Sequence, residues 1–380
     1  MAASRPRLLP AFALSAVSTV LLITGCQGVA NSAAPQAAVA SAFVYVVSNP
    51  NGNNFAINAF STDSTGQLTP VPGSPFAANV SAIAANRNYL FGTDGTNIYS
   101  FSIAANGALT QVSSTNALQS IPVAGVVSLS IDGTGTTLYA HLINDSNDDY
   151  ESFSVDHSTG VLTYLGATST GLGASPLSFA GNNLFGFSTS CFHGFTQILS
   201  FKRNNDGTLA EVFDGLTDSP DPARLCPGAV AAGPTSNLAV AFVPGGAPGG
   251  PPQDNGAVLA VYSVDSSGFL TTSSTVANMP QTAVGGMILM SPSGKFLAAG
   301  GLGLEMFHFN GADPITPFTG LLTHDLIDQM AWDNDNNLYA ISQSASKLSV
   351  FTVTATSAGP APGSSYAITN PRGIAIARRD

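Results

Sequence analysis

Two arginines and a histidine are the side chains in this sequence best suited to chemistry. Arg224 and Arg372 each precede a short apolar segment, and two guanidinium groups brought to one place would clamp a carboxylate or phosphate. His324 is followed by Asp325, and an imidazole oriented by a carboxylate can act as a general base. Two surface arginines neutralised by aspartates are the plainer alternative, and adjacent residues of a strand point to opposite faces. Arg224, His324 and Arg372 are therefore weak candidates for catalysis or binding.

The N-terminus carries an export signal. Arg5 and Arg7 precede an apolar run over residues 8–23, which ends in Leu22-Ile23-Thr24-Gly25-Cys26. A positive start, a short apolar run and small residues before a cleavage point are typical of a secretory signal peptide, here residues 1–25. A transmembrane anchor is the alternative. The run is short of the ~20 residues that a span needs, and no basic cluster follows it.

The stretch that ends at Cys26 resembles the lipobox of bacterial lipoproteins. The resemblance implies that Cys26 is acylated and becomes the first residue of the mature chain, so that the protein contacts a membrane through its lipid. Cys26 and the uncharged residues up to 41 have the composition of a flexible tether. We therefore expect an exported protein, lipid-anchored in the bacterial cell envelope and facing the periplasm or the cell surface.

Two further cysteines remain after Cys26. Cys191 and Cys226 lie in an exported chain, which meets oxidising conditions, and we predict a disulfide between them. A metal site that combines them with His193 is the alternative, but it has too few ligands for zinc.

Residues 144–151 place side chains with oxygen atoms at alternate positions, as calcium-binding loops do. They lack the glycine and the flanking helices of an EF-hand, so a solvated acidic loop is the simpler interpretation.

The candidate residues after position 42 lie in a repeated sequence pattern. An aromatic residue closes a run of alternating apolar residues seven times, with spacings of 41, 52, 48, 61, 45 and 44 residues. We call these residues the marker aromatics; they are Phe60, Phe101, Phe153, Phe201, Tyr262, Phe307 and Phe351. A period near 48 residues is that of a propeller blade. Charged residues are only 9% of the chain and Gly and Pro are frequent, which also favours an all-β protein with many turns.

Each repeat is predicted to hold four strands. A glycine and a leucine follow five of the marker aromatics, with the glycines at Gly66, Gly107, Gly160, Gly207 and Gly268. A glycine there suits the positive φ of a hairpin turn, so the marker strand and the next strand should pair. Two more apolar segments precede each marker strand, except that the first repeat has only one, residues 43–47. The missing segment is present at the C-terminus, residues 373–377.

The sequence therefore predicts a seven-bladed β-propeller over residues 42–380, in which the C-terminal strand completes the first blade. Closure would leave no sheet edge open, and an open sandwich with coincidental periodicity is the alternative. In a propeller the connections from second to third strands and those to the next blade share one face. Cys191, Cys226, Arg224, His324, Asp325, Asp328 and Arg372 should all lie on this face, together with the Gly- and Pro-rich residues 245–256.

Several segments resemble the YVTN-type seven-bladed propellers. They are Phe43-Val44-Tyr45-Val46, Gly66-Gln67-Leu68-Thr69-Pro70-Val71, Gly73-Ser74-Pro75-Phe76 and Ser291-Pro292-Ser293-Gly294-Lys295-Phe296-Leu297. That group includes the lactonase family, with 6-phosphogluconolactonase-like enzymes and carboxy-muconate cycloisomerases. The resemblance implies the fold and, as one possible activity, hydrolysis or isomerisation of a sugar-derived or aromatic lactone. The family's His, Glu and Arg set cannot be assigned to Glu151, Glu211 or Glu305, and fold alone does not assign chemistry.

The charge balance argues against one class of partner, nucleic acid. The chain has 11 basic and 22 acidic residues, a net charge of −11, which argues against nucleic acid because phosphate binding needs clustered Lys and Arg. No phosphate-cradling loop, Ser-His-Asp order or zinc spacing occurs, so we expect no cofactor and no metal. The two hypotheses are a monomeric module that binds a small molecule or protein without chemistry and, as the alternative, a lactonase.

Overall fold

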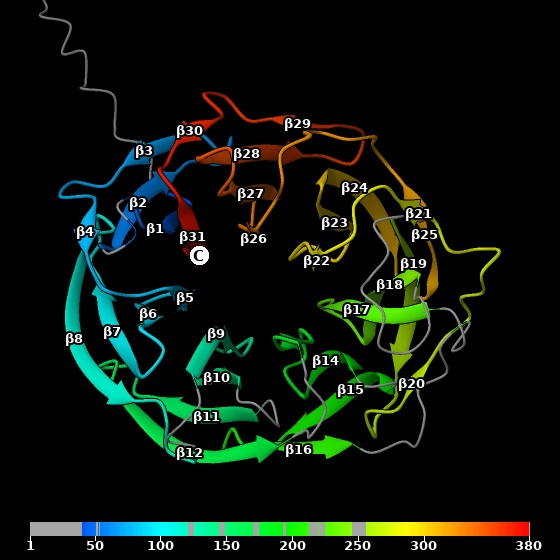
Figure 1. Cartoon of the computed structure of the whole chain (residues 1–380), viewed down its shortest axis with the longest axis horizontal. Helices are drawn as coiled ribbons and strands as arrows, with labels where there is room; N and C mark the ends of the chain where they lie inside the picture. The colour runs from blue at the N-terminus through cyan, green and yellow to red at the C-terminus, as the bar shows by residue number, and fades with distance from the viewer. Residues whose placement is uncertain are drawn as a thin grey trace, which may run out of the picture. The chain divides into compact units, whose positions relative to one another are not determined.

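In the computed structural model of the chain, the alternating apolar segments fold into seven antiparallel sheets arranged around one axis (Figure 1). The structure describes residues 40–50, 52, 54–120, 125–143, 149–169, 175–192, 195–212, 220, 225–244 and 256–379. Within these ranges the chain forms no helix that could span a membrane. The predicted seven-bladed propeller is confirmed.

We name the blades A to G and give the strands of each from the axis outwards. Blade A contains β31 (Pro371–Arg378), β1 (Ala42–Ser48), β2 (Ala56–Thr62), β3 (Leu68–Pro70) and β4 (Phe76–Ala77). Blade B contains β5 (Ala82–Ala85), β6 (Tyr89–Thr93), β7 (Asn97–Ile103) and β8 (Leu109–Asn116). Blade C contains β9 (Gly125–Ile131), β10 (Thr137–Ile143), β11 (Asp149–Val155) and β12 (Leu162–Ser169).

The remaining blades follow the same order. Blade D contains β13 (Ser178–Phe179), β14 (Phe185–Phe192), β15 (Phe195–Arg203) and β16 (Leu209–Val212). Blade E contains β17 (Leu225–Ala232), β18 (Asn237–Pro244), β19 (Ala257–Val264), β20 (Leu270–Thr271) and β21 (Gln281–Thr282). Blade F contains β22 (Met287–Met290), β23 (Phe296–Gly301), β24 (Gly303–Asn310) and β25 (Asp313–Pro317). Blade G contains β26 (Gln329–Trp332), β27 (Asn337–Ser342), β28 (Lys347–Val353), β29 (Ala358–Pro360) and β30 (Tyr366–Ala367).

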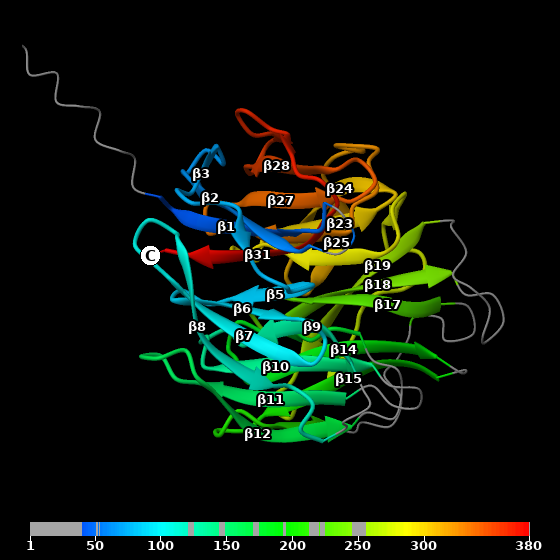
Figure 2. The ribbon, with the colours of Figure 1, turned by 60° about the vertical axis from the view of Figure 1, so that its left-hand side comes forward.

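The two ends of the propeller chain meet in blade A. β31 pairs antiparallel with β1, from Ala42 opposite Arg378 to Ser48 opposite Pro371 (Figure 2). Every residue of β1 is buried, because neighbouring blades cover both faces of the sheet. The predicted closure by the C-terminal strand is therefore confirmed, and it leaves β1 without an open edge.

The glycines of the third-to-fourth strand turns are needed for two reasons. All five predicted glycines have positive φ, between 73° and 96°. At Gly160 a Cβ atom would also lie 2.5 Å from a ring carbon of Tyr89, which belongs to the preceding blade. The same turns accept hydrogen bonds across blades: the Tyr45 hydroxyl donates to the carbonyl of Gly107 at 2.9 Å. Turn chemistry thus also determines how neighbouring blades pack.

The outer strands differ from the simple four-strand pattern. In blades A, E and G the outer strand is divided in two, and both pieces pair with the third strand. In blade A the interruption contains Pro72 and Pro75, which lack the N–H that a continuous ladder requires. The Ser74 hydroxyl accepts a hydrogen bond from the N–H of Ala59 at 2.8 Å instead. A side chain therefore replaces one backbone partner.

Candidate functional site

The strand order gives the ring two faces. Second-to-third strand connections and connections to the next blade lie at one end of the strands, which we call the loop face. First-to-second and third-to-fourth strand turns lie at the other end, the turn face. Residues 1–39 with Cys26, residues 144–148 and 245–255, His193 and Arg224 lie outside the described residues.

Arg372 and Gln329 share the loop-face end of the axis. Arg372 is the second residue of β31 and Gln329 begins β26, and these are the inner strands of neighbouring blades. Both side chains are exposed, and Gln329 Oε1 accepts a hydrogen bond from the N–H of Ile374 at 3.2 Å. No ion pair involves Arg372 among the described residues. A guanidinium group and a carboxamide are thus exposed on neighbouring inner strands at the loop-face end.

His324 and Asp325 lie in the connection from blade F to blade G, but the carboxylate has other partners. Asp325 Oδ2 lies 2.5 Å from Lys347 Nζ and accepts the Thr323 hydroxyl at 2.6 Å. These contacts, that of Lys347 first, hold the pKa of Asp325 below its ordinary value. The His324 side chain is exposed. The carboxylate next to the histidine is therefore engaged by a lysine.

Asp328 follows in the same connection. Its Oδ2 accepts a hydrogen bond from the N–H of Gln343 at 2.6 Å. Gln343 begins the connection between β27 and β28, so the aspartate joins two loop-face connections of blade G. This contact gives Asp328 a structural role.

Cys191 and Cys226 form a disulfide in the structure, with their Cα atoms 5.9 Å apart. Cys191 lies near the loop-face end of β14, and Cys226 lies near the start of β17. The bond thus connects the second strand of blade D to the inner strand of blade E. It lies on the loop face, where Arg372 also lies.

The wall of the axis is mainly apolar. The described inner strands consist largely of Ala, Gly, Val, Ile, Leu and Met, and the polar exceptions are Ser128, Ser130, Ser178, Gln329, Arg372 and Arg378. Arg378 lies toward the turn face, where its Nε and Nη2 both donate to the carbonyl of Trp332, at 3.3 and 3.0 Å. Among the described side chains, no hydrogen bonds or ion pairs bring a histidine, a carboxylate and an arginine together.

Two glutamates have a structural role that the sequence did not reveal. Glu151 and Glu305 occupy equivalent positions in blades C and F, two residues before the marker aromatic. Glu151 is fully buried, and its Oε1 accepts the N–H and the hydroxyl of Ser120, at 2.7 and 2.6 Å. Glu305 Oε2 accepts the N–H of Ala283 at 3.0 Å. Each glutamate fixes the connection that leads into its own blade, and the shared spacing from the marker aromatic is the sequence signal.

A buried polar row between blades C and D was also not predicted. Ser128 Oγ lies 3.4 Å from His141 Nδ1, and the His141 ring centroid lies 5.2 Å from that of Tyr150. The Tyr150 hydroxyl lies 2.8 Å from Ser188 Oγ in blade D. His141 is only 5% exposed, so this histidine packs inside blade C against Tyr150, and it is Tyr150 that contacts blade D. The sequence showed only a histidine in an apolar segment.

Comparison with known proteins shows the fold. No family model and no curated protein matches the chain. The solved structure of the periplasmic gluconolactonase of Pseudomonas aeruginosa superposes with a TM-score of 0.63 at 13% identity, over 88% of this chain and 98% of that one. The "putative 6-phosphogluconolactonase" of Bacteroides uniformis gives a TM-score of 0.66 at 13% identity, over 88% and 99%. A functionally unknown protein from Desulfotomaculum acetoxidans gives 0.61 at 16%, over 89% and 99%.

These similarities agree with the resemblance seen in the sequence. Each superposition covers nearly the whole of the other chain, so the ring is shared from end to end. At such low identity the match establishes the architecture, and the chemistry must be argued from this chain's own residues.

Proposed function

We propose that this protein is an exported, lipid-anchored propeller whose loop face binds a ligand without changing it. The path of the chain supports this. β1 starts at Ala42, which pairs with Thr62 at the turn-face end of β2. The chain therefore enters the ring at its turn face. The loop face lies at the opposite end of the strands, where an external partner can reach it.

The contacts of the polar side chains on the loop face favour a binding function over a catalytic one. Arg372 and Gln329 are exposed on neighbouring inner strands, whereas the Asp325 carboxylate contacts Lys347 and Thr323, and no hydrogen bond joins it to His324 among the described residues. A guanidinium group beside a carboxamide suits a carboxylate with a neighbouring hydroxyl. The proposed ligand is accordingly a small hydroxy acid.

Calorimetric titration with D-gluconate tests the binding site. The protein, extracted in detergent, should bind gluconate, and Arg372→Ala should weaken binding about 10-fold or more, since a charge-assisted hydrogen bond contributes ~1.5–3 kcal/mol. Arg372→Lys should recover only part of the affinity, because lysine lacks the bidentate geometry. Lys202→Ala removes an exposed cation of blade D and serves as the control. Equal binding by wild type and Arg372→Ala would contradict the site.

A lactonase is the second candidate, favoured by the names of the solved structures that share the fold. A pH-stat assay with glucono-δ-lactone and an aromatic lactone decides it, because each turnover releases a proton above the spontaneous rate. Acceleration that disappears in His324→Ala or Arg372→Ala would establish catalysis and reject the pure binding role. If the protein does not raise the rate of lactone hydrolysis above the spontaneous rate, the lactonase candidate is rejected and the binding function is retained.

The lipid anchor has its own test. Cells grown with radioactive palmitate should label the wild type and not Cys26→Ala. Absence of label on the wild type, or equal label on both, would reject anchoring and leave the loop-face proposal to the other two experiments.

A further inference from the structure

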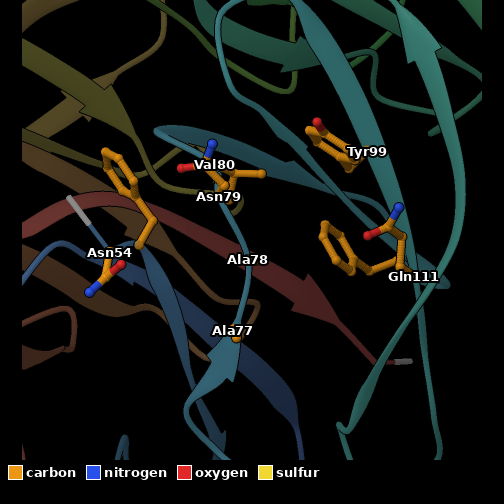
Figure 3. Close-up of a pocket in the computed structure, with 9 residues that line it drawn as sticks. Asn54, Ala77, Ala78, Asn79, Val80, Tyr99 and Gln111 are labelled. Atoms are coloured by element: carbon orange, nitrogen blue, oxygen red, sulfur yellow. The ribbon is translucent and has the colours of Figure 1, made fainter.

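A pocket of about 680 Å³ lies between blades A and B, away from the axis. Its lining consists of Asn54, Phe55, Ala77, Ala78, Asn79, Val80, Tyr99, Phe101 and Gln111. The connecting residues 77–80 run between Asn54 on one side and Tyr99 and Gln111 on the other (Figure 3). The volume falls within the range of small-molecule sites, ~300–1,000 Å³.

Two of the aromatic side chains come from one strand. Tyr99 and Phe101 both belong to β7, and side chains two residues apart lie on the same face of a strand. Gln111 of β8 is the register partner of Phe101, which places the carboxamide beside the ring. Phe55 precedes β2 in the neighbouring blade. The pocket therefore exists only where blades A and B meet.

The Tyr99 ring is held before any ligand arrives. Its hydroxyl donates to Asp94 Oδ2 at 2.7 Å, and Asp94 Oδ1 accepts the N–H of Asn97 at 2.7 Å and that of Thr96 at 2.9 Å. Asp94 is thus fixed by the backbone of its own turn, and it fixes the tyrosine. A ring that is oriented in advance loses little conformational entropy on binding.

The composition of the lining identifies the ligand class. It contains three aromatic rings and three carboxamides, and no carboxylate, ammonium, guanidinium or imidazole group. Carboxamides both donate and accept hydrogen bonds, as the hydroxyl groups of a sugar do. Aromatic faces suit the apolar C–H face of a pyranose ring, and a charged ligand would find no counter-charge. We propose that this pocket binds a neutral saccharide ring, stacked on Tyr99 and hydrogen-bonded by Gln111, Asn54 and Asn79.

This site is separate from the axial one. Arg372 and Gln329 lie on inner strands, whereas the pocket is made by third and outer strands and the connection between two blades. Saccharide binding here depends on neither the lipid anchor nor the ligand of the axis. Each proposal can therefore fail without the other.

Saturation-transfer difference NMR tests the proposal. The probes are methyl β-D-glucopyranoside, methyl β-D-galactopyranoside and methyl α-D-mannopyranoside, with the full chain in a detergent that has no sugar headgroup. At least one glycoside should receive saturation, strongest on the protons of one ring face. The signal should fall at least five-fold in Tyr99→Ala and about three-fold in Gln111→Ala.

The controls distinguish this pocket from other surfaces. Tyr164→Ala removes a tyrosine of blade C that is 37% exposed, and it should leave the signal unchanged. Gln111 is exposed, so its variant tests the site even if Tyr99→Ala fails to fold. The proposal is overturned if no glycoside receives saturation, or if the signal is as strong in Gln111→Ala as in the wild type. Glucuronate or indole receiving saturation in place of the glycosides would also overturn it.

Discussion

Blades A and D are built into the ring in different ways. In blade A the inner strand β31 pairs with β1 along the whole strand, from Ala42 to Ser48. In blade D the inner strand β13 is Ser178–Phe179, and both of its residues pair with β14. Blade D is joined to blade E by the Cys191–Cys226 disulfide. A full hydrogen-bonded ladder holds the place where the chain ends meet, and a covalent bond supports the place where the inner ladder is short.

The two blades also differ at the residue that immediately precedes the marker aromatic. In blade A the residue before the marker aromatic is Ala59, and its N–H donates to Ser74. In blade D the same position is Ser200, which pairs with Val212 of the outer strand β16. The Ser200 hydroxyl is buried and has no hydrogen-bond partner in the described chain. Ser100 and Ser152 repeat this arrangement in blades B and C. In blade A a hydroxyl accepts the backbone N–H of this position, whereas in blades B, C and D the residue at this position carries a buried hydroxyl without a partner in the described chain.

Removing the closing strand should have the largest effect. A stop codon at position 371 deletes β31 with its buried residues Ile374, Ala375 and Ala377, and it exposes the edge of β1. We expect a loss comparable to the whole stability of a domain, ~5–15 kcal/mol, and therefore insoluble protein. A stop codon after Arg379 is the control. Soluble truncated protein with the melting temperature of the wild type would show that the ladder in blade A is dispensable.

Reducing the disulfide should have the next largest effect. Loss of a bond between residues 35 apart in sequence removes ~3–4 kcal/mol on the chain-entropy model, so urea unfolding should shift to lower concentration. The double variant Cys191→Ser with Cys226→Ser should unfold like the reduced protein and should not respond to reductant. Thiol titration of the unfolded, unreduced protein checks the bond itself. Two free thiols there would rule out the covalent support of blade D.

Ser74→Ala should destabilise blade A by ~1–3 kcal/mol, because the buried N–H of Ala59 loses its partner. Ser74→Thr keeps a hydroxyl and should recover part of the loss. The midpoint and slope of urea unfolding measure both variants. No change in Ser74→Ala would mean that water replaces the hydroxyl.

Ser200→Ala is the matched change in blade D and should have the opposite sign. It removes a buried hydroxyl without a partner in the described chain, so stability should stay equal or rise by up to ~1 kcal/mol. The same unfolding experiment measures it. A loss above ~1 kcal/mol would show that the two blades do not differ at this position.

The smallest effect concerns pH. Asp63 and Asp206 occupy the third-to-fourth strand turns of blades A and D, and the pKa of each is lowered from 3.8. Around Asp206 the first cause is the Thr208 hydroxyl; around Asp63 partial burial opposes the shift, and hydrogen bonds from Thr65 and Gln67 outweigh it. A lowered pKa favours the ionised carboxylate in the folded state. The stabilisation is therefore complete above pH ~4 and is lost as the pH falls through the folded pKa.

Carbon-13 NMR of the carboxyl groups measures both titrations. Thr208→Val should return the pKa of Asp206 toward 3.8 and leave that of Asp63 unchanged. An Asp206 titration that does not move would show that the hydroxyl is not the cause. Asp63 serves as the internal control because its partners lie in another blade.

The repeat could be predicted because the sequence signals of each blade lie within a few residues of one another. Each blade has a marker aromatic, and five of the seven also have a glycine with positive φ and a following leucine. These signals depend on strand and turn chemistry within a few residues. The closing strand was predictable as well, since the first repeat lacked a segment that the C-terminus supplied. The division of the outer strands in blades A, E and G was not foreseen, because two-residue pieces such as β4 and β21 are too short to carry a pattern.

The candidate site was less predictable. That Arg372 and His324 belong to the loop face follows from strand order, so the sequence alone was sufficient. The sequence could not show that Asp325 forms an ion pair with Lys347, or that Glu151 accepts a hydrogen bond from Ser120. These partners lie 22 and 31 residues apart and meet only through the packing of strands and connections.

The sequence by itself determined the number of blades, the order of strands and the joining of the two chain ends, because periodicity and turn residues act over short distances. Only the tertiary structure decided which side chains meet between blades, including the pocket of Tyr99, Phe101 and Gln111 against Phe55. Such contacts depend on the angle at which two twisted sheets pack side by side. No single segment of the chain encodes that angle.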